Sequence, residues 1–174
     1  MATRDWIRLI SASIVLLAVQ ILVLNNLNLN QYMFPQLYIM VLITLPINLK
    51  HWIGYLIAFV LGFILDGFSY TPGLQAFTGT AIMFLRYEYF NRLVDKEWLS
   101  TGVRPTFGLV DTGWFVTYTT IFTFLFHFIL FTIEDFNFFG YSTTLLKILY
   151  SSSLAVFLIL LFQFTFNRVQ LNDE

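Results

Sequence analysis

Residues Gly62 to Ala76 read G-F-I-L-D-G-F-S-Y-T-P-G-L-Q-A, and they join two apolar segments of the chain. It places Asp66 near the end of an apolar helix, follows it with a Gly/Pro turn, and starts a second apolar segment at Pro72-Gly73. An ionisable side chain within lipid costs roughly 2.5–3.5 kcal/mol on insertion scales, so it usually faces a helix bundle or a water-filled cavity. We therefore expect the other helices to form a scaffold around Asp66.

The composition points to a membrane protein. Of the 174 residues, 58% are hydrophobic and only 11% are charged, whereas an average soluble domain is roughly 25% charged. The net charge of −1 and the lack of a basic stripe argue against a nucleic-acid partner. The sequence has no cysteine, which excludes disulfides and thiol chemistry. No cofactor or metal site is expected.

Apolar segments of membrane-spanning length predict the fold class. A helix needs about 20 apolar residues to cross the hydrocarbon core, or fewer where the bilayer thins. The chain offers six such segments, over about 6–24, 34–49, 52–67, 72–90, 113–133 and 142–166. We predict an all-α membrane protein, with six transmembrane helices in one bundle and residues 1–174 as a single domain. Residues 91–112 are polar and broken by Gly and Pro, and are interpreted as a loop.

The basic residues predict the orientation. Lys147 lies alone at one set of helix ends, and eight basic residues lie at the other: Arg4, Arg8, Lys50, Arg86, Arg92, Lys96, Arg104 and Arg168. Cytoplasmic loops of membrane proteins carry the excess of Lys and Arg. Both termini and the loop 91–112 are therefore expected in the cytoplasm.

The third predicted span carries small residues at spacings of four. Gly54, Ala58, Gly62 and Asp66 form one slowly turning stripe on a helix. Small residues let a second helix approach closely, which favours a tight contact that ends at a buried Asp66. The alternative is ordinary bundle packing with Asp66 near the outer headgroups. From Trp52 to Asp66 the helix rises about 21 Å, short of the roughly 30 Å core, so Asp66 is expected toward the outer leaflet.

The connection after Asp66 defines a candidate structural site. A helix N-terminus favours a nearby carboxylate through its free N–H groups and its dipole. We expect Asp66 to accept backbone N–H bonds from the turn or from the start of the next helix, and so to tie the two helices together. The residues that accompany it in this site are Gly67, Pro72, Gly73, Gln75 and Ala76.

Other polar residues carry weaker signals. Residues 86–98 have helical apolar spacing, which fits either an amphipathic helix that docks a cytoplasmic partner or a simple continuation of the fourth span. His127 is expected to pack or hydrogen-bond rather than to bind a ligand. Glu134 and Asp135 are expected to be solvated loop charges. No nucleophile, metal-ligand set or opposed carboxylate pair is evident, so an enzyme is not expected.

The chain as a whole resembles the MreD family, the rod shape-determining membrane proteins of bacteria. The specific part is G-F-I-L-D at 62–66 followed by P-G-L-Q-A at 72–76, where Gly62, Asp66, Gly73 and Ala76 fit the family pattern. The Phe-rich fifth span and the long 91–112 segment are less typical of the family.

The resemblance implies a non-enzymatic scaffold of the cell-elongation machinery in the bacterial inner membrane. The partners that it implies are MreC, and through it RodA, a class B penicillin-binding protein and MreB. The family is also similar in fold to the substrate-binding subunits of energy-coupling-factor vitamin transporters. The alternative is therefore a small-molecule-binding subunit with a pocket near the outer face, for which the polar candidates are Asp66, Gln75, Asn28 and Asn30.

Overall fold

The computed structural model describes residues 3–26, 32–94, 102–135 and 141–170, and these residues form helices joined by turns and irregular segments. The α-helices are α1 (Thr3–Leu22), α2 (Ile39–Ile43), α3 (His51–Ser69), α4 (Leu74–Leu93), α6 (Thr112–Asp135) and α7 (Tyr141–Gln170), and a short 3-10 helix η1 covers Leu24–Asn26. The all-α prediction is confirmed. Five of the predicted spans agree with the observed helices to within a few residues.

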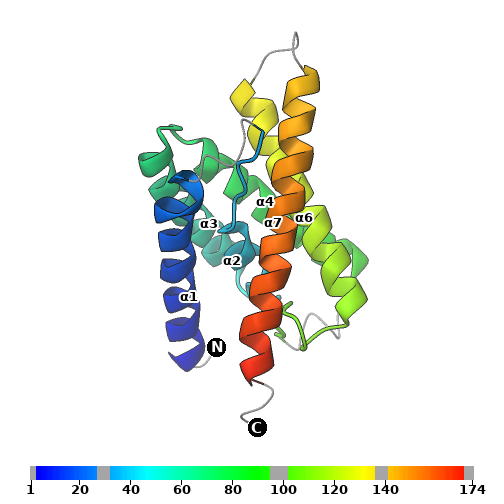
Figure 1. Cartoon of the computed structure of the whole chain (residues 1–174). Coiled ribbons are helices and arrows are strands. Elements are labelled where there is room, and N and C mark those ends of the chain that lie inside the picture. Colours follow the sequence, from blue (N-terminus) through cyan, green and yellow to red (C-terminus); the bar gives the residue numbers. More distant parts are fainter. Residues whose placement is uncertain (1–2, 27–31, 95–101, 136–140, 171–174) are drawn as a thin grey trace.

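The helices form a bundle with two distinct ends (Figure 1). The start of α1 and the end of α7 lie at one end of the bundle, which we call the terminal end. The opposite end holds the turn between α3 and α4, together with η1 and the end of α6, and we call it the turn end. α3 packs along α4, and α6 packs along both α4 and α7.

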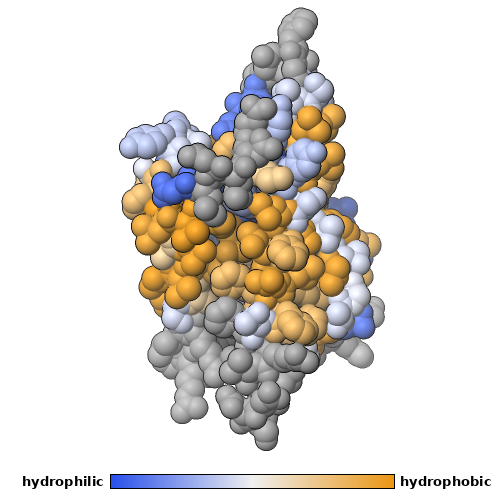
Figure 2. Space-filling view, viewed as in Figure 1, coloured by the Kyte–Doolittle hydropathy of each residue, from blue (hydrophilic) through white to orange (hydrophobic). Residues whose placement is uncertain are grey.

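Four helices in the described ranges are long and apolar enough to cross a membrane: Leu9–Asn26, His51–Ser69, Thr112–Asp135 and Tyr141–Thr165. Their exposed side chains contribute to an apolar band across the middle of the face shown in Figure 2, with more polar residues above it. α4 has 20 residues but carries Gln75, Arg86, Glu88 and Arg92, which lower its hydropathy. The chain is a multi-pass membrane protein.

The predicted helix over 34–49 is wrong as a continuous helix. Only Ile39–Ile43 are helical, and the chain on both sides of α2 runs through turns and extended backbone. Pro35 and Pro46 bracket the helix, and proline disfavours helical backbone in the residue before it and removes a main-chain donor. We call residues 32–49 the central segment, because most of its side chains are buried among the other helices.

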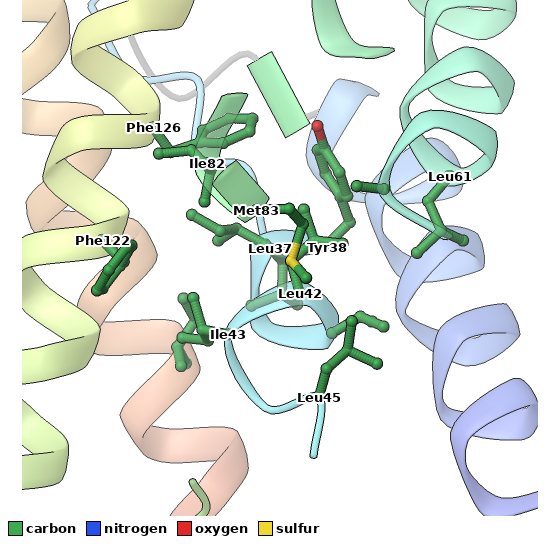
Figure 3. Packing of buried hydrophobic residues seen from close by; sticks show 14 of the residues in the cluster. Leu37, Tyr38, Leu42, Ile43, Leu45, Leu61, Ile82, Met83, Phe122 and Phe126 are labelled. Atoms are coloured by element: carbon green, nitrogen blue, oxygen red, sulfur yellow. The ribbon is translucent and has the colours of Figure 1, made fainter. Parts of the chain in front are cut away.

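The core of the protein is built around this central segment (Figure 3). Side chains from three long helices surround α2: Leu61 from α3, Ile82 and Met83 from α4, and Phe122 and Phe126 from α6. They contact the apolar residues of the central segment, which include Leu37, Tyr38, Leu42, Ile43 and Leu45. Tyr38 meets Phe126 edge to face, with ring centroids 5.5 Å apart. Within a membrane, such close packing stabilises the bundle through dispersion contacts rather than through hydrophobic burial.

Candidate functional site

Asp66 joins the end of α3 to the start of α4. Its Oδ1 accepts hydrogen bonds from the main-chain N–H of Gln75 at 2.8 Å and from the Thr71 hydroxyl at 2.9 Å. Its Oδ2 accepts from the main-chain N–H of Ala76 at 3.0 Å. The expected backbone hydrogen bonds are therefore present, and the carboxylate lies against a helix N-terminus, where a negative charge is favoured.

The turn between α3 and α4 needs two residues in the left-handed region. Tyr70 has φ 57° and Gly73 has φ 79°. The main-chain N–H groups of Tyr70 and Thr71 turn back to the carbonyl of Asp66, which closes α3. Gly is the residue that adopts this conformation without a steric cost, and Gly73 uses this freedom to start α4. Asp66 thus accepts hydrogen bonds through both its carbonyl and its carboxylate.

The glycine stripe of α3 lies against α4. A Cβ added at Gly62 would stand 2.6 Å from the backbone of Ala76, and one at Gly54 would stand 2.1 Å from the Tyr87 hydroxyl oxygen. Ala58, between them on the stripe, is fully buried. The two helices approach closely because these side chains are small.

The structure brings together only part of the predicted site. Gly62, Asp66, Gln75 and Ala76 meet at the α3–α4 contact. Gly67 and Pro72 are exposed, and a Cβ at Gly67 or Gly73 would meet nothing within 4 Å. Gly54 and Ala58 lie further along α3, toward the terminal end.

Side chains from three helices hold the central segment near the turn end. Gln20 of α1 accepts from the main-chain N–H of Leu37 at 2.7 Å and donates to the Pro35 carbonyl at 3.1 Å. His127 of α6 accepts from the Gln36 N–H at 3.2 Å, which confirms its expected hydrogen-bonding role. Ser151 of α7 accepts from the Phe34 N–H at 2.9 Å. These bonds replace those that a continuous helix would have made.

A buried arginine and a tyrosine hold the other end of α2. The Tyr118 hydroxyl donates to the Ile43 carbonyl and accepts from Arg86 Nε, both at 2.9 Å. A second nitrogen of Arg86 donates to the Leu45 carbonyl, and its guanidinium lies 5.0 Å from the centre of the Phe90 ring. Helix C-termini favour a cation near their free carbonyls.

Arg86 corrects the charge count made from the sequence. The sequence places Arg86 among the cytoplasmic helix ends, but its side chain is fully buried inside the bundle. The signal that could have found it is an arginine within the apolar run A-I-M-F-L-R at 81–86, because an ionisable residue in a span usually faces the interior of the bundle. α4 continues past it to Leu93, which favours the simple continuation for 86–93. Residues 95–98 of the amphipathic stretch lie outside the described ranges.

These contacts explain how an irregular segment can lie inside a membrane protein. Non-helical backbone at membrane depth is tolerated only where protein or trapped water satisfies its polar groups. Gln20, His127, Ser151, Tyr118 and Arg86 do this for the central segment, and they come from α1, α6, α7 and α4. The polar residues inside the bundle therefore hold its backbone in place.

A cavity of about 360 Å³ opens at the turn end. It lies between the ends of several helices and the start of the central segment, and its lining includes Asn25, Gln36, Gln75, Glu134 and Lys147. Of the predicted pocket residues, Gln75 lines this cavity. The carboxylate of Asp66 is occupied by the start of α4, and Asn28 and Asn30 lie outside the described residues.

Asp135 corrects a second expectation. It is not a freely solvated loop charge, because it ends α6 and its carboxylate accepts from Lys147 Nζ at 2.8 Å and from the Thr144 hydroxyl at 2.7 Å. The pair is about three-quarters buried, with side chains 25% and 24% exposed. It ties the end of α6 to the first turns of α7. Glu134 beside it is exposed, as expected, but it belongs to the last turn of α6 rather than to a loop.

The chain matches a known protein family. The family described as rod shape-determining protein MreD matches residues 3–165, nearly the whole chain. The chain belongs to the MreD family. Comparisons with curated proteins and with solved structures gave no significant match. Membership of the MreD family implies a role in determining rod shape, and the family is one of non-catalytic membrane proteins.

Proposed function

We propose that the protein is a non-enzymatic scaffold of the cell-elongation machinery in the bacterial inner membrane. It binds MreC, and through MreC it supports RodA, a class B penicillin-binding protein and MreB during peptidoglycan synthesis. Membership of the MreD family supports this proposal. The observation that carries it is that the family match covers residues 3–165, nearly the whole chain. The bonds from both carboxylate oxygens of Asp66 fix α3 against α4 and contribute the rigidity that a scaffold needs.

The proposed topology has six crossings, with both termini in the cytoplasm and the turn end outside. The central segment provides the second crossing as a broken helix. Its Gln36 bonds to His127 and its Ile43 bonds to Tyr118, and these partners are about 14 Å apart along α6 at 1.5 Å per residue. The segment therefore passes through a substantial depth of the bundle. Without Arg86, the remaining basic residues still favour a cytoplasmic terminal end.

Co-purification tests the scaffold. The tagged protein, extracted from native membranes in mild detergent, is expected to retain MreC, and the Asp66→Ala variant is expected to retain less of it at equal protein level. Glu88→Ala is the matched control, because Glu88 is a carboxylate in an exposed pair with Arg92 on α4. Failure of the wild-type protein to retain any elongation protein, together with normal rod shape after its depletion, would rule out this function.

A second candidate function is supported by the cavity at the turn end. A small-molecule-binding subunit, of the kind found in energy-coupling-factor transporters, needs polar groups that converge on an outer pocket. Gln36 and Gln75 line such a cavity here. A thermal-shift screen with soluble vitamins distinguishes the two functions, since a ligand that binds the folded state raises its apparent stability. A pure scaffold is expected to show no shift.

A further inference from the structure

Two buried amide side chains of the cavity lack full sets of partners. Gln36 and Gln75 are 8% and 3% exposed, and both line the cavity. Gln75 Oε1 accepts from the Tyr38 hydroxyl at 3.2 Å, but its Nε2 has no protein partner among the residues described. The side-chain amide of Gln36 has none within the same ranges. Both residues are buried, but their amide atoms without a partner stay accessible from the cavity, so they offer hydrogen-bonding groups to a polar molecule there.

The ends of three helices make the cavity electrically negative. Its lining includes Leu24 and Asn25 beyond the end of α1, Phe68 and Ser69 at the end of α3, and Leu130, Phe131 and Glu134 near the end of α6. Each helix C-terminus carries the equivalent of about half a negative charge on its free carbonyls. The start of α4 also borders the cavity, but the carboxylate of Asp66 already neutralises it.

The charged side chains add to this negative potential. Glu134 lines the cavity and forms no ion pair within the described part of the chain. Lys147 also lines it, but its ammonium is engaged by the carboxylate of Asp135. Glu134, Lys147 and its partner Asp135 together carry one negative charge in excess. An anionic ligand is therefore disfavoured here, and a cation is favoured.

We propose that this cavity binds a small organic ammonium ion, with the cation near Glu134 and a polar group of the ligand against Gln36 and Gln75. Phe34, Phe68 and Phe131 also line the cavity, and aromatic rings attract cations. A volume of about 360 Å³ lies in the usual range for small-molecule sites. This inference rests on the second candidate function and names its ligand class. A soluble amine and the headgroup of an ethanolamine lipid share this chemistry.

The first experiment uses the full-length protein purified in a maltoside detergent. Its melting temperature is measured against choline chloride and ethanolamine hydrochloride, with sodium chloride at equal ionic strength as the reference. We expect a saturable rise with at least one amine, and an apparent affinity at least tenfold weaker in Glu134→Gln. Glu88→Gln, which removes a carboxylate near the far end of α4, is expected to match the wild type. Gln36→Leu is expected to weaken binding as well.

The second experiment separates the two sources of the ammonium group. The protein is placed in nanodiscs of equal phosphatidylethanolamine and phosphatidylglycerol, and the lipids that it retains are identified by native mass spectrometry. If the protein retains phosphatidylethanolamine preferentially, and Glu134→Gln abolishes this preference, the site binds the lipid headgroup. If the protein responds only to soluble amines, the site binds a free ligand.

The proposal is overturned if neither experiment shows binding, or if Glu134→Gln binds as the wild type does. Either result would leave the scaffold function untouched, because that function is measured by retention of MreC.

Discussion

The carboxylate of Asp66 accepts a hydrogen bond from the main-chain N–H of Ala76 at 3.0 Å, beside the point where Gly62 touches the Ala76 backbone. Asp66 supplies the hydrogen bond to α4, and Gly62 supplies the space that this bond needs. The carboxylate can reach α4 only because nothing larger than a hydrogen stands at Gly62. The stability of the α3–α4 hairpin should therefore depend on both positions.

Replacement of Asp66 by alanine should destabilise the protein by about 3 kcal/mol, because it leaves two buried N–H groups at the start of α4 without acceptors. Asp66→Asn should cost less, because its amide oxygen can still accept one of these bonds. Thermal melting in detergent and the steady-state protein level measure the effect. An unchanged melting temperature of Asp66→Ala would show that the hydrogen bonds of the Asp66 carboxylate contribute little to stability.

Replacement of Gly62 by alanine should destabilise the hairpin by about 1–3 kcal/mol, the usual cost of overpacking. Its new Cβ would stand 2.6 Å from the Ala76 backbone, so α3 and α4 would have to separate. Gly67→Ala is the matched control. Gly67 lies on the same helix as Gly62, and a Cβ added there would meet nothing within 4 Å. Its melting temperature should stay equal or rise slightly, because alanine favours helix. Equal melting of both variants would contradict the close approach.

Replacement of Tyr118 by phenylalanine should cost about 1–3 kcal/mol, because it removes the hydroxyl that bonds to both Arg86 and Ile43. Tyr89→Phe is the control. The Tyr89 ring packs beside that of Tyr118, but the Tyr89 hydroxyl forms no hydrogen bond within the described part of the protein. The difference in melting temperature between the two variants measures the contribution of the buried hydroxyl. No difference would argue that Arg86 holds α2 without help.

Replacement of Gln20 by leucine should destabilise the protein by about 2–4 kcal/mol, because it leaves the Leu37 N–H and the Pro35 carbonyl unpaired. Thr117→Val serves as the control, since this exposed hydroxyl bonds to the Gly113 carbonyl of its own helix and to no other group in the described residues. Melting and limited proteolysis both report the change, and cleavage within the central segment is expected to increase. Resistance equal to that of the wild type would indicate that packing alone fixes the segment.

The tie at Asp66 could be predicted because all its signals lie within fifteen consecutive residues. A glycine, an aspartate, a Pro-Gly turn and a new apolar segment follow one another from Gly62 to Ala76. The all-α class and the long helices followed from hydropathy alone. These are local properties of the chain.

The central segment could not be predicted in the same way, because its partners are distant in sequence. Gln36 bonds to His127, 91 residues away, and Phe34 bonds to Ser151, 117 residues away. Hydropathy describes residues 34–49 correctly as an apolar segment, but it does not distinguish a continuous helix from a broken one. The two prolines at its ends were the local signal that this segment differs.

Accessibility from the two sides of the membrane tests whether the chain spans the bilayer with its turn end outside. The chain has no cysteine, so single cysteines can be placed at Tyr70, an exposed residue of the turn end, and at Asn91, an exposed residue near the end of α4. A membrane-impermeant maleimide, given access to the outer face of the inner membrane, should label Tyr70→Cys. Asn91→Cys should be labelled only after that membrane is permeabilised. Labelling of Asn91→Cys from outside, with Tyr70→Cys protected, would contradict the topology and the place of the cavity.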